Sequence, residues 1–199
     1  MIKFDIGANF GSDTESLAAD GSRVFAFEPS ILLYQKLRER FLDRPSVTIF
    51  PFAITDTNGF SLFNVSDVGD KGVGSLYDFH PNLANTVLGV HAEFSTPPVA
   101  KELVPTMRLD TFMDVWNIDE IDHLHIDAQG SDFKVLQSLG DRIYDVKAGQ
   151  VECTLDIPLY SGVDNSHDSV LQYLESKGFT VEVAYIHNNR SEEIGRAHV

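Results

Sequence analysis

Cysteine is nearly absent from this chain of 199 residues, in which Cys153 stands alone. A single thiol cannot close an intrachain disulfide, and it cannot supply a cysteine cluster for zinc. Long apolar runs are lacking as well: none approaches the roughly 20 residues that cross a bilayer, and no signal-peptide pattern opens the chain. We therefore expect a protein of the reducing cytoplasm.

Basic residues are scarce, since 15 Lys and Arg face 30 Asp and Glu for a formal net charge of -15. Binding to nucleic acid or to anionic lipid requires clustered cations, which this balance does not favour. The hydrophobic share of 43% is that of an ordinary globular domain. We expect no nucleic acid and no membrane among the partners, but a small-molecule or carbohydrate acceptor.

Strand and helix patterns alternate at the start of the chain. Apolar strand patterns occupy 2–6, 23–27 and 47–53, and a helical pattern follows each of the first two. The first helix opens at a predicted capping box, in which Ser12 caps the helix and Glu15 reaches back to it. This order predicts a parallel sheet with right-handed crossovers.

Regular patterning breaks over 55–106, where glycine and proline recur. A turn at 57–59 suggests a hairpin between 49–54 and 60–65. Long stretches without periodicity are usually functional or disordered, so we expect 55–106 to form an irregular insert that serves as a substrate wall. Periodicity then returns, with helices expected at 109–116, 131–139 and around 170–174, and strands at 121–127, 149–154 and 179–186.

The last ten residues, 190–199, look foreign to the rest of the chain. The DNA stem AGATCGGAAGAG of sequencing adapters translates to Arg-Ser-Glu-Glu, which is the sequence at 190–193. We expect 190–199 to be a non-native adapter tail, with a natural polar tail as the alternative. Residues 1–189 then form a single domain, and the native C-terminal strand is expected to be missing.

A glycine turn follows the first strand, in the pattern Asp5-x-Gly7-x-Asn9-x-Gly11. A strand that ends in such a turn and enters a helix presents free N–H groups to a ligand. The pattern departs from the dinucleotide fingerprint G-x-G-x-x-G, because Asn9 replaces its second glycine and Ser12 its third. The alternative is a turn that needs glycine for structural reasons only.

Glu28 ends the second strand, about twenty residues after the glycine turn. An acidic residue at this place in a βαβ unit reaches the hydroxyls of a bound ribose. Pro29 beside it fixes the direction of the chain. The alternative is a solvated acid before a helix N-terminus, where its charge is favourable. Together, the turn and Glu28 favour a ribose-containing ligand.

Further polar residues follow the next two predicted strands. Asp127 comes at the end of the fourth, with His125 on the same face, and Glu152 ends the fifth. Ligands of open α/β sheets bind at the carboxyl ends of strands, so Asp127 points into the same crevice as Gly7. A half-buried histidine with a satisfied hydrogen bond is the alternative for His125. A metal bound by Asp127, Glu152 and a histidine is a further alternative, but no spaced ligand motif supports it and we expect none.

Several segments, taken in order, resemble the FkbM family of S-adenosylmethionine-dependent methyltransferases. They are Asp5-Ile-Gly-Ala-Asn-Phe-Gly11, Phe27-Glu-Pro29, Leu109-Asp-Thr111, Ile126-Asp-Ala-Gln-Gly-Ser-Asp132, Glu152, Pro158-Leu-Tyr160 and Gly178-Phe179. The resemblance implies an α/β fold: the three-layer αβα, Rossmann-like class I methyltransferase fold, with a mostly parallel sheet that lacks its C-terminal strand if the tail is foreign. It departs from the family at His125, where lysine is common, and at Asp132, where glutamate is usual.

The resemblance also implies S-adenosylmethionine as the cofactor and a methyl transfer that usually goes to a hydroxyl oxygen. It places the methionine part of the cofactor at Asp5, Gly7, Ala8 and Asn9, the ribose at Glu28 and the adenine beside Phe52 and Ala53; Gly11, Thr14 and Pro29 complete this predicted cofactor site.

Methyl transfer from a sulfonium is an in-line displacement, so the enzyme positions the acceptor and removes its proton. Asp127, His125 and Glu152 are the candidates for this general base. Asp127 has the best position, and the histidine has the ordinary pKa closest to neutrality. A nucleotide-dependent oxidoreductase and a non-catalytic cofactor-binding module are the alternative functions.

Overall fold

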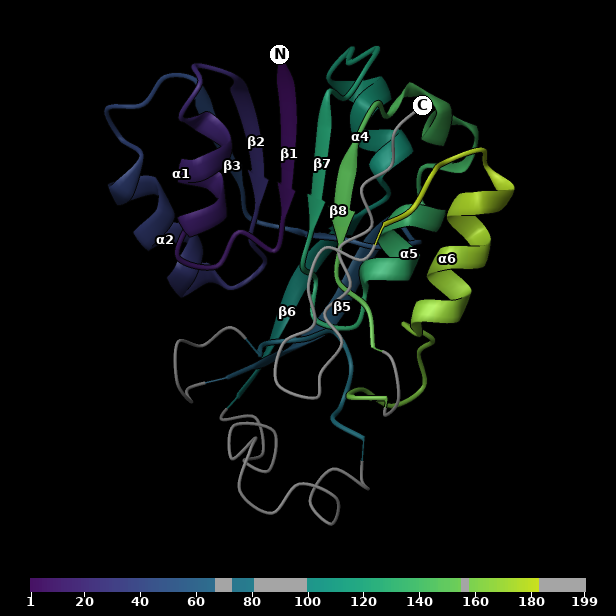
Figure 1. Ribbon diagram of the computed structural model, residues 1–199. Helices are drawn as coiled ribbons and strands as arrows, with labels where there is room; N and C mark the ends of the chain where they lie inside the picture. The colour runs from purple at the N-terminus through teal and green to yellow at the C-terminus, as the bar shows by residue number, and fades with distance from the viewer. Residues whose placement is uncertain (67–72, 81–99, 155–157, 183–199) are drawn as a thin grey trace.

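The chain forms a central parallel sheet of five strands in the order β3-β2-β1-β7-β8 (Figure 1). The computed structural model describes residues 1–66, 73–80, 100–154 and 158–182. The order of the strands reverses between β1 and β7, the switch point at which open α/β sheets bind ligands. The strands are β1 (Ile2–Ile6), β2 (Arg23–Phe27), β3 (Val47–Phe50), β7 (His123–Ile126) and β8 (Gly149–Val151).

Helices cover both faces of this sheet, as side-chain alternation along the strands requires. One face carries α1 (Ser12–Ala18) and α2 (Ile31–Arg40), with Leu37 and Phe41 packed on Ala26. The opposite face carries α4 (Leu109–Val115), α5 (Asp132–Gln137) and α6 (His167–Ser176), whose apolar side chains share one core with Phe4 and Phe25. The predicted three-layer αβα, Rossmann-like fold is therefore confirmed.

An aromatic cluster fills the centre of the larger core. Phe112 of α4 is fully buried, and its ring centroid lies 4.8 Å from that of Phe27 and 5.0 Å from that of Phe50. Both contacts are edge-to-face, the arrangement that the ring quadrupole favours. Phe112 thereby ties α4 to the two strands whose ends reach the crevice.

The residues after β3 build a second sheet, and here two predictions were wrong. The strand predicted over 47–53 ends at Phe50, and β4 (Ala53–Ile54) pairs in parallel with β6 (Ala100–Met107). β5 (Gly59–Val65) also pairs with β6, so the hairpin between 49–54 and 60–65 does not form. The sequence did not predict β6, because Pro105 lowers the strand signal. The structure accommodates this proline because β4 pairs only with Thr106 and Met107, so Pro105 has no neighbour on the β4 side of β6.

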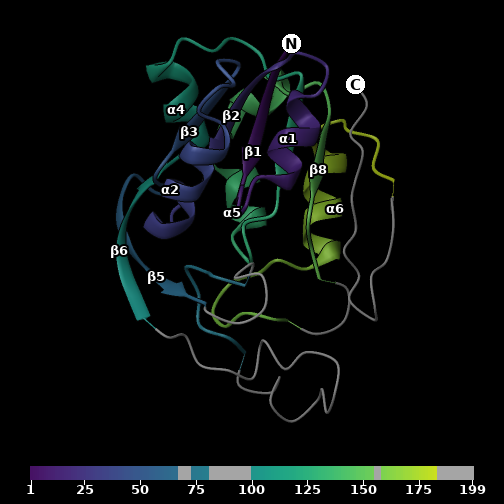
Figure 2. The same cartoon turned by 90° about the vertical axis from the view of Figure 1, so that its left-hand side faces the viewer.

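The β5–β6 ribbon lies beyond the carboxyl ends of the central strands in both views (Figures 1 and 2). It therefore stands at the edge of the sheet where a ligand of this fold class binds. Within the described part of 55–106, the predicted irregular insert is thus largely a sheet. Residues 67–72 and 81–99 of it lie outside the described residues.

Other elements differ from the sequence predictions in detail. The capping box is wrong: Gly11 is the N-cap of α1 without a side-chain cap bond, and the carboxylate of Glu15 pairs with Arg40 and Arg44 instead. A 3₁₀ helix at Gly140–Asp145, labelled η2, was not predicted.

The two predictions for the C-terminal part of the chain concern residues that lie largely outside the described ones. Of the strand predicted at 179–186, the structure describes 179–182, where Thr180 forms a single β-bridge but no strand is formed, and the predicted tail 190–199 lies wholly outside. In the part of the chain that the structure describes, no helix is both long and apolar enough to cross a membrane.

Phe112→Ala should lower the free energy of unfolding by about 3–5 kcal/mol, because it removes a buried ring and leaves a cavity among its aromatic neighbours. Phe60→Ala is the matched control, since that side chain is 72% exposed. Its cost should be below about 1 kcal/mol. Urea unfolding followed by circular dichroism measures both; equal losses in the two variants would contradict the role of the cluster.

Candidate functional site

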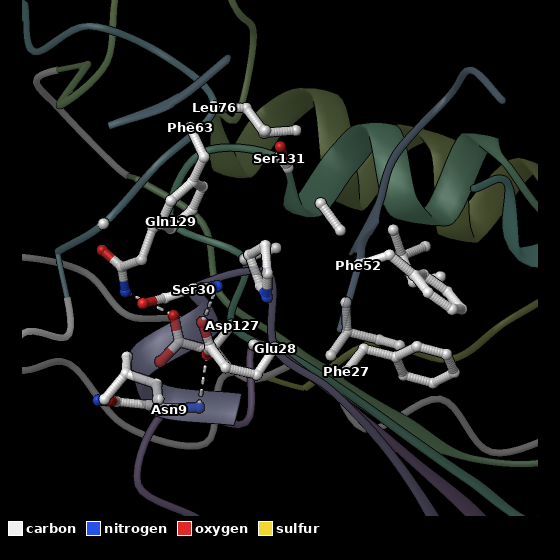
Figure 3. A pocket seen from close by; sticks show the side chains of 18 of the residues that line it. Asn9, Phe27, Glu28, Ser30, Phe52, Phe63, Leu76, Asp127, Gln129 and Ser131 are labelled. Atoms are coloured by element: carbon white, nitrogen blue, oxygen red, sulfur yellow. Dashed lines mark hydrogen bonds between the residues drawn. The ribbon is translucent and has the colours of Figure 1, made fainter. Parts of the chain in front are cut away.

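A cavity of about 290 Å³ opens at the carboxyl ends of β1, β2 and β7 (Figure 3). Its walls come from the turns after these strands, from the start of α2, from the segment after β3 and from β5. The lining residues are Ile6, Gly7, Asn9, Phe27, Glu28, Pro29, Ser30, Leu32, Leu33, Phe52, Ala53, Ile54, Phe63, Val65, Ser66, Gly74, Leu76, Asp127, Ala128, Gln129 and Ser131.

Gly7 brings the turn after β1 against the turn after β7. Its φ is +90°, and a Cβ there would lie 1.8 Å from the carbonyl oxygen of Asp127. No side chain fits into that space, so glycine is required by the packing of the protein itself. Packing alone therefore explains why a glycine stands at position 7, without any role in binding. The same close contact explains why the two turns form one wall of the cavity.

The N–H groups of the glycine turn are occupied within the protein. Those of Gly7 and Ala8 both donate to the carbonyl of Phe27, at 3.0 Å each. The N–H of Gly11 donates to the carbonyl of Ala8 (2.7 Å), and that of Asn9 to the carboxylate of Glu28 (2.9 Å). The expectation of free N–H groups at these four positions was wrong, because the close-packed turn uses them to hold its own shape.

Glu28 lies at the centre of the cavity wall and is only 4% exposed. Its Oε2 accepts from Asn9 and its Oε1 accepts from the N–H of Ser30 (2.8 Å). Burial raises its pKa to about 7, and the charges of Asp5 and Asp127 act in the same direction although the two N–H donors oppose them. Ionisation of the Glu28 carboxyl group at the cavity wall therefore costs free energy in the folded protein.

Two polar atoms on the cavity wall have no hydrogen-bond partner among the described residues. They are Oδ1 of Asn9 and Oγ of Ser131, both buried. Buried polar atoms are usually paired, so an unpaired one that lines a cavity is open to a hydrogen bond from a ligand or a water molecule. Ser131 occupies the predicted cap position of α5, but its side chain makes no cap bond.

Asp5, Thr14 and His125 form a group beside the cavity that does not line it. Asp5 is fully buried; one carboxylate oxygen accepts from the hydroxyl of Thr14, and the other lies 2.9 Å from Nδ1 of His125. Asp5 and His125 are register partners on β1 and β7. Although burial disfavours the charged ring, the hydrogen bond and charge of Asp5 raise the pKa of His125.

This placement favours the alternative that His125 is a half-buried histidine with a satisfied hydrogen bond. It also places Asp5 and Thr14 behind the turn, where they fix α1 to β1. Among the other predicted cofactor residues, Gly7, Asn9, Glu28, Pro29, Phe52 and Ala53 line the cavity, whereas Ala8 and Gly11 do not. Gly11 instead leaves room for the side chains of Leu37 and Phe41.

Asp127 lines the cavity, and Glu152 lies close behind it. The amide Nε2 of Gln129 is 2.6 Å from Oδ1 of Asp127 and 3.4 Å from Oε2 of Glu152. The structure thus brings the two predicted acids together through Gln129, a residue that sequence reasoning did not single out. Its signal in the sequence is only its place in the motif after β7.

Asp132 completes a group of three carboxylates whose ligand oxygens lie within 4.8 Å of one another. Its own oxygens, however, accept from the N–H groups of Ala128 (2.6 Å) and Gly130 (3.0 Å) and from Nδ2 of Asn165 (2.9 Å). Burial and the charge of Asp127 raise the pKa of Asp132. These bonds show that Asp132 holds the turn after β7, so the group does not strengthen the alternative of a metal site.

The sequence predicted a substrate wall over 55–106, but it did not identify which apolar residues of this segment line the cavity. Phe63 of β5 and Leu76 after it line the cavity on the side away from Glu28, and Val65 of β5 is a further lining residue. Alternation in 60–65 indicated a strand but not which of its faces would meet the site. The described part of the predicted substrate wall thus contributes to the lining of the cavity.

Glu28→Gln should flatten the pH dependence of stability between about pH 4.5 and 7. The pKa of Glu28 rises from 4.5 to about 7 on folding, so the folded state binds more protons in this window and the wild type loses stability as pH rises. The shift corresponds to at most ~3 kcal/mol. Urea unfolding at pH 5 and pH 8 measures the change, which should be smaller in the variant; parallel curves would refute the buried acid.

Comparison with known families agrees with this architecture. The model of the methyltransferase FkbM domain matches residues 5–181, from β1 past the end of α6. A comparison with curated proteins finds no match. Because the family match covers most of the chain and includes every strand and turn that builds the cavity, the chain belongs to the FkbM methyltransferase family.

Proposed function

We propose that this methyltransferase uses S-adenosylmethionine and methylates a hydroxyl oxygen of a sugar or another small molecule. One observation carries the choice of cofactor: the polar groups of the cavity are mainly oxygen acceptors, and none of the described residues that line it is a Lys, Arg or His. Asn9 Oδ1 and the carboxyl groups of Glu28 and Asp127 form one acceptor-rich end. Such an end is suited to hydroxyl groups and to cations.

S-adenosylmethionine offers both kinds of group, because it carries a ribose diol, an ammonium and a sulfonium. Glu28 would hold the diol, Asn9 Oδ1 the ammonium, and Phe52 with Ala53 the adenine. Bound there, the cofactor supplies an electrophilic methyl group. A dinucleotide would instead bring a pyrophosphate to two carboxyl groups, with no basic residue among the described lining of the cavity and with the four turn amides already used.

The chain's own part in the reaction is to orient the acceptor and to take its proton. We assign the proton to Asp127, which lines the cavity, and a supporting position to Glu152 behind it. His125 is held by Asp5 away from the lining. Asp127 would take the proton of the acceptor hydroxyl as its oxygen gains the methyl group, while the methyl–sulfur bond of the cofactor would break and leave a neutral thioether.

The partners follow from the same charges. A net charge of -15 and an acidic cavity support a neutral small-molecule or carbohydrate acceptor, and they favour neither nucleic acid nor a membrane. We propose the cytoplasm as the compartment, on the argument from the single cysteine.

Titration calorimetry with S-adenosylmethionine and with NAD tests the choice of cofactor. The wild type should bind S-adenosylmethionine, and Glu28→Gln should weaken this binding by about tenfold or more, because a charged acceptor for the ribose hydroxyls is lost. Glu39→Gln, an exposed change on α2, is the matched control and should bind like the wild type.

Binding of NAD without binding of S-adenosylmethionine would refute the proposal in favour of an oxidoreductase. Binding of S-adenosylmethionine without methyl transfer to any member of a panel of sugars and small alcohols would favour a non-catalytic module.

A further inference from the structure

Gln129 sits in a backbone conformation that a glutamine rarely adopts. Its φ is +48°, in the left-handed region, and the next residue, Gly130, has a φ of +94°. A non-glycine residue in this region costs free energy unless its surroundings hold it there. The hydroxyl of Ser75, which is 1% exposed, donates to the carbonyl of Gln129 at 2.6 Å and fixes the turn from the side of the second sheet.

The amide of Gln129 is held in one orientation by Tyr160. The phenol O–H donates to Oε1 of Gln129 at 2.7 Å, so the NH₂ end of the amide must face the other way. Tyr160 is itself buried, and its ring takes the space in which a Cβ on Gly130 would fall, 2.6 Å from Cδ2. The ring of Phe79 also packs against the ring of Tyr160, and their centroids lie 5.6 Å apart.

The NH₂ end of this amide faces two acids. Nε2 donates to Oδ1 of Asp127 at 2.6 Å and lies 3.4 Å from Oε2 of Glu152; Figure 3 shows Gln129 beside Asp127. Two neighbouring carboxylates repel each other, and a donor placed between them favours their ionised forms. Asp127 also interacts with the charges of Glu28 and Asp132, both acidic, and with that of the basic His125 on β7.

We propose that Gln129 is a positioning residue, which keeps Asp127 ionised and turned to the cavity beside Glu152, and that Tyr160 and Ser75 hold Gln129 for this purpose. The role of Gln129 in proton transfer rests on the proposed function, whereas its hydrogen bonds to Asp127 and Tyr160 do not. A purely structural glutamine would need neither the strained turn nor an amide directed at the cavity acid.

Carbon-13 NMR of the Asp and Glu carboxyl groups tests this, with the Asp127 signal assigned by Asp127→Asn. Gln129→Met keeps the length of the side chain and removes its donor, so the titration midpoint of Asp127 should rise by about one unit. Gln129→Glu adds a negative charge and should raise it further. Tyr160→Phe leaves the amide without its orienting donor and should raise it by a smaller amount.

Gln172→Met, an exposed change on α6, is the matched control and should leave the midpoint where it is in the wild type. An Asp127 curve in Gln129→Met that superimposes on the wild-type curve would overturn the proposal. If Gln129→Met does not fold, an unshifted midpoint in Tyr160→Phe would overturn it equally.

Titration with S-adenosylmethionine separates this inference from the proposed function. Gln129→Met should bind the cofactor within about threefold of the wild type, since Gln129 makes none of the contacts proposed for the diol or the ammonium. A wild type that does not bind S-adenosylmethionine would refute the proposed function and would leave the NMR result intact. A large loss of cofactor affinity in Gln129→Met alone would overturn the positioning role.

Discussion

The site depends on the contact between the turns that follow β1 and β7. Because Gly7 has no side chain, its backbone approaches the carbonyl of Asp127 so closely that a Cβ would lie 1.8 Å from that oxygen. The N–H groups of the turn after β1 donate to the carbonyls of Phe27 and Ala8 and to the carboxylate of Glu28. What remains for a ligand is a wall of acceptors, and this single packing constraint thus sets the charge preference of the cavity.

That preference has a cost in stability. Glu28 is buried beside Asp127 with its pKa raised to about 7, and Asp132 is buried on the other side of Asp127 with a raised pKa as well. A protein selected for stability alone would not gather these carboxyl groups in one place. The backbone N–H donors around Glu28 and Asp132 offset part of the repulsion, and the amide of Gln129 does the same for Asp127.

Much of the fold could be predicted, because its patterns are local. The strands at 2–6 and 23–27 and the helices of the αβα layers follow from apolar periodicity and from glycine and proline at their ends. The second sheet was not predictable in this way. β6 pairs with β5 across a gap of more than thirty residues. Such a long-range pairing leaves no local signal.

The sequence by itself determined the class of the protein: the order of strands and helices, the glycine turn, Glu28 and Asp127 at the ends of strands, and an acidic composition. Only the tertiary structure decided what each residue does. It turned Asp5 and His125 toward each other and away from the lining, because they are partners on neighbouring strands. It also brought Tyr160 and Ser75, from two other segments, onto Gln129, whose amide contacts the carboxylate of Asp127. Tertiary packing decides which residues far apart in the chain become hydrogen-bond partners, and the sequence alone does not show these contacts.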